Sequence, residues 1–201
     1  MTIIVGYLEP AGKIWMAADS RVSDHDSAFI FPQRAKKLHR CGDWLIGGSS
    51  SSRFDEFWED GSHQWGSVRV LRDEFLTFVK ELGVEPHGEA NDKGEPPAYG
   101  FSLLAARAAE LWLISSNASL MQPAWGFAAV GSGQDFAYGA AHALLGTKMP
   151  IQALIGNPIE RIEKVGEICC HGGEAIVRAA VQAACAFRGD CGGEIDIETV
   201  G

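Results

Sequence analysis

The strongest constraint on the fold is a pair of continuous apolar segments at the start of the chain. Ile3 to Leu8 is an apolar run rich in β-branched residues, and Ile14 to Ala18 is a second run. The turn sequence Glu9 to Gly12 separates the two. Neither run alternates between apolar and polar residues, which is typical of strands covered on both faces. This segment therefore predicts a β-hairpin buried between two other layers.

Similar patterns predict the remaining strands. Turn residues separate apolar runs that we expect to form strands at Ala28–Phe31 (ended by Pro32), in a hairpin that turns at Cys41–Asp43 and returns through Trp44–Gly48, and at Phe101–Ala106, Leu111–Ser116, Trp125–Val130 and Glu194–Val200.

Apolar residues at helical spacing predict the helices. Val68 to Leu82 is amphipathic, and the hydroxyls of Ser49 to Ser52 indicate a helix start before it. Three later helical faces are expected, at Phe136, Ala140 and Leu144, at Pro158, Ile162, Val165 and Cys169, and at Ile176, Ala180, Ala184 and Phe187. The order of strands, helices, strands, helices and a last strand predicts an α+β, four-layer αββα sandwich. A length of 201 residues suits one domain, 1–201.

Composition argues against several classes of protein. The net charge of −9 argues against a nucleic-acid partner, which needs a basic surface. No apolar run approaches the ~20 residues of a membrane span, and no basic region precedes the first apolar residues, so we expect a cytoplasmic protein. The five cysteines, an odd number with one adjacent pair, favour reduced thiols. Cys169-Cys170-His171 lacks the separated ligand pairs of a zinc site, so no metal is expected.

Thr2 directly follows the initiator methionine. Removal of Met1 would leave a free α-amine and a hydroxyl on one residue. The amine titrates near pH ~7.7–8.0, so at neutral pH part of it can accept the hydroxyl proton. Many threonines at this position merely start a strand. The interpretation as a nucleophile therefore depends on whether the chain supplies a cation, a carboxylate and an oxyanion donor.

Four short motifs follow Thr2 in a specific order. They are Ala17-Ala18-Asp19-Ser20-Arg21, Lys36-Lys37-Leu38, Leu45-Ile46-Gly47-Gly48 and Val130-Gly131-Ser132-Gly133. This succession resembles the proteasome β-subunit family, and particularly its bacterial HslV-type members, from Thr2 to about Leu145. These proteins are N-terminal-nucleophile (Ntn) hydrolases with an αββα sandwich.

The resemblance implies a role for one residue of each motif. Thr2 corresponds to the nucleophile, Asp19 to the acidic residue, Lys37 to the catalytic lysine, Gly47 to the oxyanion-hole glycine and Ser132 to the serine that supports the terminal amine. Lys36 is the weaker candidate, because its side chain should leave the strand on the opposite side.

Elementary chemistry agrees with these roles. A lysine cation near the Thr2 hydroxyl favours the alkoxide, and Asp19 can hold that lysine in place. A glycine N–H can meet a developing oxyanion without a side chain in the way. Each residue also has an ordinary structural explanation: a surface ion pair for Asp19 and Lys37, a strand bulge for Gly47 and a helix cap for Ser132.

The C-terminal region departs from the family pattern of Asp, two residues and Ser-Gly-Gly. Here the run is Arg188 to Gly193, with Cys191 in the place of the serine. Asp190, Cys191 and Gly192 are therefore the candidates to support the amine, and Gly189-Asp190 is an alternative match to an HslV-type Gly-Asp. The longer connection Pro150–Gly173 predicts an added helix.

The resemblance implies a threonine-type endopeptidase subunit of a self-compartmentalised ring, hexameric or heptameric, without a cofactor. Its substrates would be peptides or unfolded proteins, and an ATPase unfoldase is a possible partner. Two alternatives stay open. One is an Ntn amidohydrolase acting on a small amide, because fold does not fix substrate. The other is a non-catalytic ring subunit that keeps Met1 or lacks the residues that support the terminal amine.

Overall fold

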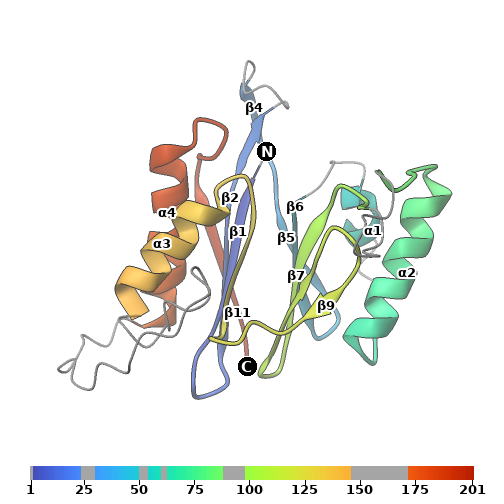
Figure 1. Cartoon of the computed structure of the whole chain (residues 1–201), viewed down its shortest axis with the longest axis horizontal. Helices are drawn as coiled ribbons and strands as arrows, with labels where there is room; N and C mark the ends of the chain where they lie inside the picture. Colours follow the sequence, from blue (N-terminus) through green and yellow to red (C-terminus); the bar gives the residue numbers. More distant parts are fainter. Residues whose placement is uncertain (1, 24–29, 50–53, 60–62, 88–97, 146–171) are drawn as a thin grey trace, which may run out of the picture.

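The computed structural model describes residues 2–23, 30–49, 54–59, 63–87, 98–145 and 172–201. Two antiparallel sheets lie face to face, with helices α3 and α4 covering one and helices α1 and α2 covering the other (Figure 1). The predicted four-layer αββα sandwich is confirmed. No helix in these ranges is long and apolar enough to cross a membrane.

The first sheet carries the N-terminus on an inner strand. Its strand order is β10-β1-β2-β11, formed by β10 (Phe127–Gly131), β1 (Ile3–Leu8), β2 (Ile14–Asp19) and β11 (Ile195–Val200). β1 pairs with β2 on one side and with β10 on the other, from Ile3↔Gly131 to Tyr7↔Phe127. The start of β1 is therefore enclosed by segments that are far apart in the sequence.

The second sheet has the order β5-β6-β7-β8-β9. Its strands are β5 (Leu38–Cys41), β6 (Trp44–Ser49), β7 (Ser102–Arg107), β8 (Glu110–Ile114) and the short β9 (Leu120–Met121). A separate ribbon pairs β3 (Arg21–Ser23) with β4 (Ile30–Arg34). This ribbon extends beyond the sandwich at the end where Thr2 lies (Figure 1).

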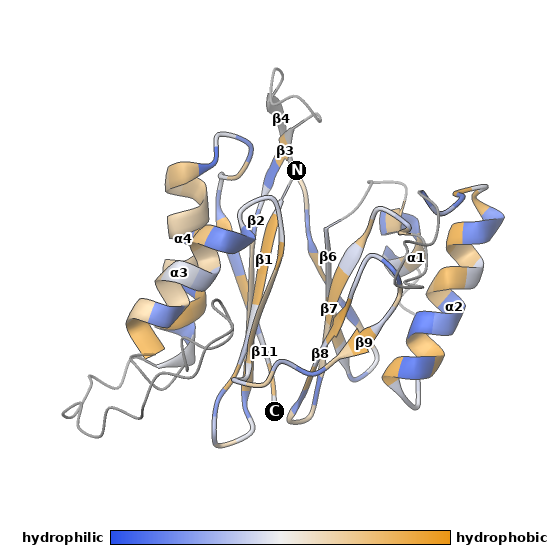
Figure 2. Cartoon of the chain, viewed as in Figure 1, coloured by the Kyte–Doolittle hydropathy of each residue, from blue (hydrophilic) through white to orange (hydrophobic). Residues whose placement is uncertain are grey.

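The helices are α1 (Asp55–Glu59), α2 (Val68–Glu81), α3 (Gln134–Leu145) and α4 (Gly173–Phe187). Ser67 caps α2 by accepting a hydrogen bond from the Val70 N–H. Apolar residues face inward from each layer (Figure 2), and they form one cluster between the sheets and one beneath each helical pair. Continuous apolar strands arise because both faces of each sheet are covered.

Several sequence predictions were wrong in detail. Pro32 does not end its strand, because β4 runs through it and the register shifts there. Proline is tolerated at such an edge-strand irregularity. The buried face of α3 consists of Ala137 and Ala141, whereas Phe136 is 38% exposed. Phe187 is 70% exposed and stacks on Phe136 instead of entering the core.

The predictions for Ile176, Ala180 and Ala184 are confirmed, since all three are buried on α4. The short strand β9 was missed, because two residues carry no period. The expected helical face at Pro158–Cys169 and residues 150–171 of the longer connection lie outside the described residues. The same holds for Ser50 to Ser52, of the expected helix start.

Candidate active site

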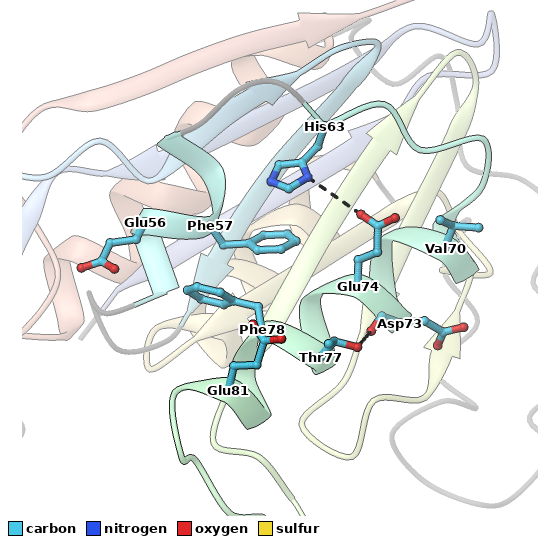
Figure 3. A pocket seen from close by; sticks show the side chains of 9 residues that line it. All are labelled: Glu56, Phe57, His63, Val70, Asp73, Glu74, Thr77, Phe78 and Glu81. Atoms are coloured by element: carbon cyan, nitrogen blue, oxygen red, sulfur yellow. Dashed lines mark hydrogen bonds and ion pairs between the residues drawn. The ribbon is translucent and has the colours of Figure 1, made fainter.

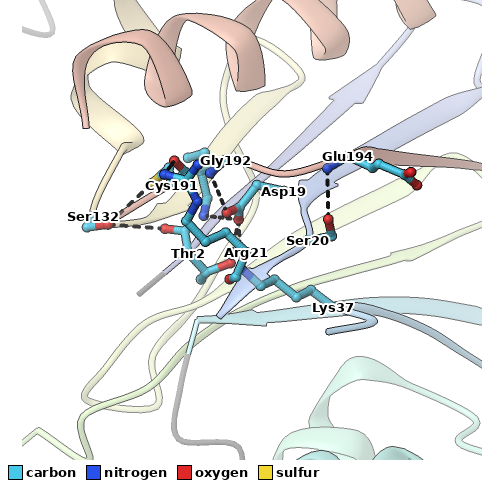
Figure 4. A network of polar contacts seen from close by, with 10 residues as sticks. Thr2, Asp19, Ser20, Arg21, Lys37, Ser132, Cys191, Gly192 and Glu194 are labelled. Carbon is cyan, nitrogen blue, oxygen red and sulfur yellow. Dashed lines mark hydrogen bonds and ion pairs between the residues drawn. The ribbon is translucent and has the colours of Figure 1, made fainter. Parts of the chain in front are cut away.

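The site begins where β1 and β2 meet at one end of the first sheet. Asp19 is the last residue of β2 and is fully buried. Its Oδ1 accepts hydrogen bonds from the Thr2 hydroxyl and from the Ile3 N–H, both at 2.9 Å (Figure 4). Thr2 itself is only 6% exposed. The antiparallel pairing of the two strands therefore brings the predicted nucleophile onto the predicted acid.

Lys37 reaches the same carboxylate oxygen from the segment before β5. Its Nζ donates to Asp19 Oδ1 at 2.8 Å and to the backbone oxygen of Arg21 at 2.8 Å. The Thr2 hydroxyl and the Lys37 ammonium are thus held side by side on one oxygen atom. Lys36 is exposed, in keeping with its expected opposite direction.

Ser132 approaches Thr2 from the turn after β10. Its N–H and its hydroxyl both donate to the Thr2 carbonyl, at 3.0 and 3.4 Å. This approach needs the glycine before it. Gly131 has a φ of +107°, and a Cβ there would lie 2.1 Å from the Thr2 carbonyl oxygen. Only a residue without a side chain allows β10 to pass so close to the nucleophile.

The loop after α4 closes the site on its remaining side. The Gly192 N–H donates to Asp19 Oδ2 at 2.9 Å. Cys191 Sγ lies 3.6 Å from the Ser132 hydroxyl (Figure 4). Asp190 is 1% exposed and is bound by the Arg188 guanidinium at 3.1 and 3.0 Å. The loop therefore brings all three candidate amine-support residues to the site, each with a different contact.

Electrostatics differ between the two buried acidic groups of this loop. Burial raises the pKa of Asp190, but hydrogen bonds from Arg188 and Ser132 outweigh it, so the pKa lies below its ordinary value. Burial raises the pKa of the Cys191 thiol, and this effect outweighs the hydrogen bond with Ser132, which lowers it. At neutral pH the loop thus offers a carboxylate and a neutral thiol.

Two further residues of the motif that contains Asp19, namely Ser20 and Arg21, also contribute to the site. The Arg21 guanidinium donates to the backbone oxygens of Gly189 and Cys191, both at 2.8 Å. Ser20 Oγ accepts from the Glu194 N–H at 2.9 Å. These contacts fasten the C-terminal loop to the end of β2. Their position directly after Asp19 was the signal that could have identified them.

Gly47 lies on β6, paired with Leu38 of β5 and Leu104 of β7. A Cβ at this position would lie 2.7 Å from Ile4 Cγ2 and 3.0 Å from Leu38 Cδ2. The close packing of the two sheets therefore explains the missing side chain. A role for the Gly47 N–H toward an oxyanion stays a prediction.

One hollow of the molecule lies away from this site. A groove of about 570 Å³ runs between α1 and α2, with carboxylates around Phe57, Phe78 and His63 (Figure 3). Among the residues that the structure describes, no three His, Cys, Asp or Glu side chains gather in a way that could hold a metal ion.

Comparison with known proteins adds evidence on the fold. No family profile matches the sequence, and no curated protein matches it. BPH of Thiobacillus denitrificans aligns over 100% of this chain and 97% of its own, with a TM-score of 0.69 and 20% identity. BPH in complex with epoxomicin gives a TM-score of 0.70 at 20% identity, over 99% and 98% of the two chains.

Eukaryotic HslV from Trypanosoma brucei aligns over 99% of both chains, with a TM-score of 0.63 and 21% identity. At such identities the likeness is one of fold. The chain has the αββα sandwich fold of the HslV-type proteins that its sequence motifs resemble.

Proposed function

We propose that this chain is a threonine-type peptidase subunit in which Thr2, after loss of Met1, is the N-terminal nucleophile. The observation that carries the proposal is the convergence of the Thr2 hydroxyl and the Lys37 ammonium on Asp19 Oδ1. A solvated surface pair would not explain it, since Asp19 is fully buried and the Lys37 side chain is 10% exposed.

Each group has a chemical task in this proposal. Thr2 Oγ1 adds to the peptide carbonyl carbon while the Thr2 amine takes the hydroxyl proton. The C–N bond then breaks, and the departing amine receives that proton, which leaves an ester on Thr2. Water, deprotonated by the same amine, cleaves the ester and restores the hydroxyl. The Lys37 charge stabilises the alkoxide-like oxygen, and Asp19 keeps the lysine in place.

The structural neighbours support the same proposal. BPH of Thiobacillus denitrificans forms a complex with epoxomicin, and the fold is shared with HslV. We extend the proposal to a cytoplasmic homo-oligomeric ring with peptide or unfolded-protein substrates, in which an ATPase unfoldase would supply the latter.

The intact mass of the purified protein, with and without epoxomicin, tests the nucleophile. An epoxyketone forms a ring only with a hydroxyl and a free amine on one residue. We expect loss of Met1 and one adduct per chain, and no adduct with Thr2→Ala. Retention of Met1 together with no adduct would favour the non-catalytic ring subunit. A monomer that hydrolyses small amides but not peptides would favour the amidohydrolase.

A further inference from the structure

The groove between α1 and α2 lies in the helical layer that covers the second sheet, whereas Thr2 directly precedes β1 of the first sheet (Figure 1). Its volume is about 570 Å³. One face of α2 borders it over three turns, because the lining residues occupy positions i, i+3, i+4, i+7, i+8 and i+11 of the helix: Val70, Asp73, Glu74, Thr77, Phe78 and Glu81. This face is about 16 Å long.

The groove face of α2 carries apolar side chains in addition to those that the helix buries in the core. The fully enclosed residues of α2 are Val68, Leu71, Phe75 and Val79. On the groove face, Val70 is 43% exposed and Phe78 is half-buried. Phe57 of α1 places its ring 5.1 Å from that of Phe78. Exposed apolar side chains that gather in a groove, instead of being scattered singly, are typical of an interaction site.

Carboxylates flank this apolar strip. In Figure 3, Glu56 lies on one side of the Phe57 ring and Glu74 lies on the other, while Glu81 lies beside Phe78. The described lining of the groove contains four carboxylates and no lysine or arginine. The groove therefore attracts a cationic partner, on a chain whose net charge is already −9.

Two of these four carboxylates are available to a partner. Asp73 is paired with the arginine that precedes it, at 2.7 Å. Glu74 accepts a hydrogen bond from the Trp65 indole N–H at 2.6 Å. Glu56 and Glu81 are exposed, and neither forms an ion pair with a residue in the described ranges. A cationic partner can therefore pair with both of them without breaking an existing interaction.

The shape of the groove suits a helix better than a small molecule. It is open to solvent along its length, since the side chains of Asp73 and Glu74 are 63% and 52% exposed. A small cation would keep much of its surface in water here. An amphipathic helix can instead place one apolar face along the whole groove, with its charged residues at the edges.

We propose that this groove docks an amphipathic, basic helix of another protein. The apolar residues of that helix lie against Val70, Phe57 and Phe78. Its lysine or arginine side chains pair with Glu56 and Glu81. The interaction uses no residue of the Thr2 site, so it adds to the proposed peptidase a surface that holds a partner.

Fluorescence anisotropy with two labelled peptides tests this proposal on the full-length protein. Both peptides have about 15 residues, enough to span the groove as a helix, and both carry leucines at helical spacing. One has lysines beside the leucines, and the other has glutamates at the same positions. We expect the lysine peptide to bind roughly tenfold more tightly. Its binding should weaken as NaCl rises from about 0.1 to about 1 M, because the Debye length falls from about 10 to about 3 Å.

Charge reversals separate the groove from the general negative charge of the protein. Glu56→Lys combined with Glu81→Lys should weaken binding of the lysine peptide roughly tenfold, because two attractions become repulsions. Glu59→Lys combined with Glu85→Lys is the matched control, with the same change of net charge at two exposed glutamates that do not line the groove. It should change the affinity less than about twofold. Val70→Ser should weaken binding about threefold, because apolar contact is lost.

Several outcomes would overturn the proposal. Failure of the lysine peptide to bind, equal affinity for the two peptides, or an equal loss in the two double variants would show that the groove docks no basic helix. A smaller assembled mass by light scattering in the Glu56→Lys, Glu81→Lys variant alone would mean that a second copy covers the groove. Displacement of the peptide by an equal concentration of spermidine would mean that the site takes small polyamines. The substituted side chains are all exposed, so urea unfolding should match the wild type and separate lost binding from lost folding.

Discussion

At the scale of single residues, the Asp19 carboxylate determines how the site responds to mutation. It is fully buried and paired with the Lys37 ammonium. Lys37→Ala should abolish peptide hydrolysis, because the cation next to the Thr2 hydroxyl is lost. It should also destabilise the fold by about 3–5 kcal/mol, because a buried charge stays unpaired. Initial rates together with urea unfolding measure the two effects.

Lys36→Ala is the matched control for Lys37→Ala. Lys36 is exposed, so both hydrolysis and unfolding free energy should change little. If Lys36→Ala abolished turnover and Lys37→Ala did not, the assignment of the catalytic lysine would be wrong by one residue.

Two titratable residues, the buried His39 and the half-buried Asp55, predict opposite responses of stability to pH. The pKa of His39 is lowered to about 4, by burial and then by Lys36. The unfolded chain therefore binds a proton that the folded chain does not, and stability is lost as pH falls from about 6.5 to 4. This contribution is on the order of 3 kcal/mol. The pKa of Asp55 is raised to about 6, by burial and then by the charge of Glu59. The folded chain therefore binds a proton that the unfolded chain does not, so Asp55 stabilises the fold below about pH 4 and this stabilisation is lost as pH rises through 6.

Variants separate these two contributions. Compared with the wild type, His39→Gln should lose less stability on acidification from pH 6.5 to 4. Asp55→Asn should lose more, because the compensating gain disappears. Urea unfolding at pH 4, 5, 6 and 7 measures both. Curves that run parallel to the wild type would show that neither group has a perturbed pKa in the folded state.

At the scale of elements, the β7–β8 hairpin is strained at its turn. Ala108 and Ala109 have φ values of +29° and +65°, where a Cβ is unfavourable. Asn-Gly is the preferred pair for such a turn. Ala108→Asn with Ala109→Gly should therefore raise the unfolding free energy by about 1 kcal/mol.

Ala105→Gly is the control for this prediction, because Ala105 is a buried residue in the middle of β7. It should lower the unfolding free energy by about 1 kcal/mol. A turn variant that destabilised as much as Ala105→Gly would mean that the two alanines do not adopt the left-handed conformation.

Glycines near α3 give a second prediction for an element. Gly139 lies inside the helix, and an added Cβ there would meet no atom within 4 Å. Gly139→Ala should stabilise the protein by about 0.5–1 kcal/mol. At Gly133 a Cβ would lie 2.6 Å from the Ala184 Cβ, so Gly133→Ala should separate α3 from α4 and destabilise. Thermal unfolding of the two variants should shift in opposite directions.

The same elements explain where sequence reasoning succeeded. The bounds of strand β1 were predicted correctly, because a continuous apolar run between turn residues indicates a strand of a sheet that is covered on both faces. The predicted buried face of α3 was wrong, because the real one consists of the alanines Ala137 and Ala141, which share a core cluster with residues of α4. Small residues permit a close helix pair but give a weak hydrophobic pattern. The larger Phe136 dominated the apolar pattern of this segment, but its side chain is exposed on the surface of α3.

At the scale of the whole molecule, the site joins segments that are far apart in the sequence. Thr2, Asp19 and Lys37 were identified from motif order, and the geometry brings all three together. Arg21 received no role in advance, because its partners are the backbone oxygens of Gly189 and Cys191, which only the complete fold brings next to it. Motif order alone carries no information on such contacts.

Ring assembly gives a prediction for the whole molecule. The chain has a mass of 21.6 kDa. If it forms the proposed rings, light scattering should give a sixfold or sevenfold multiple of that mass, or twice such a multiple for stacked rings. Thr2→Ala should assemble in the same way, because the hydroxyl bonds within its own chain. A monomer at micromolar concentration would contradict the ring.

The inner position of β1 has a consequence for biosynthesis. Strand β1 pairs with β10, and the Asp19 carboxylate beside Thr2 accepts a hydrogen bond from the Gly192 N–H. The surroundings of Thr2 therefore cannot form until nearly the whole chain has been translated. At roughly 5–20 residues per second, Gly192 follows Thr2 out of the ribosome by about 10–40 s. Since Thr2 is almost completely covered in the folded chain, an aminopeptidase that removes Met1 would have those seconds on the nascent chain in which to act. If Thr2 is the proposed nucleophile, the speed of translation would then affect the fraction of chains that lose Met1 and become active.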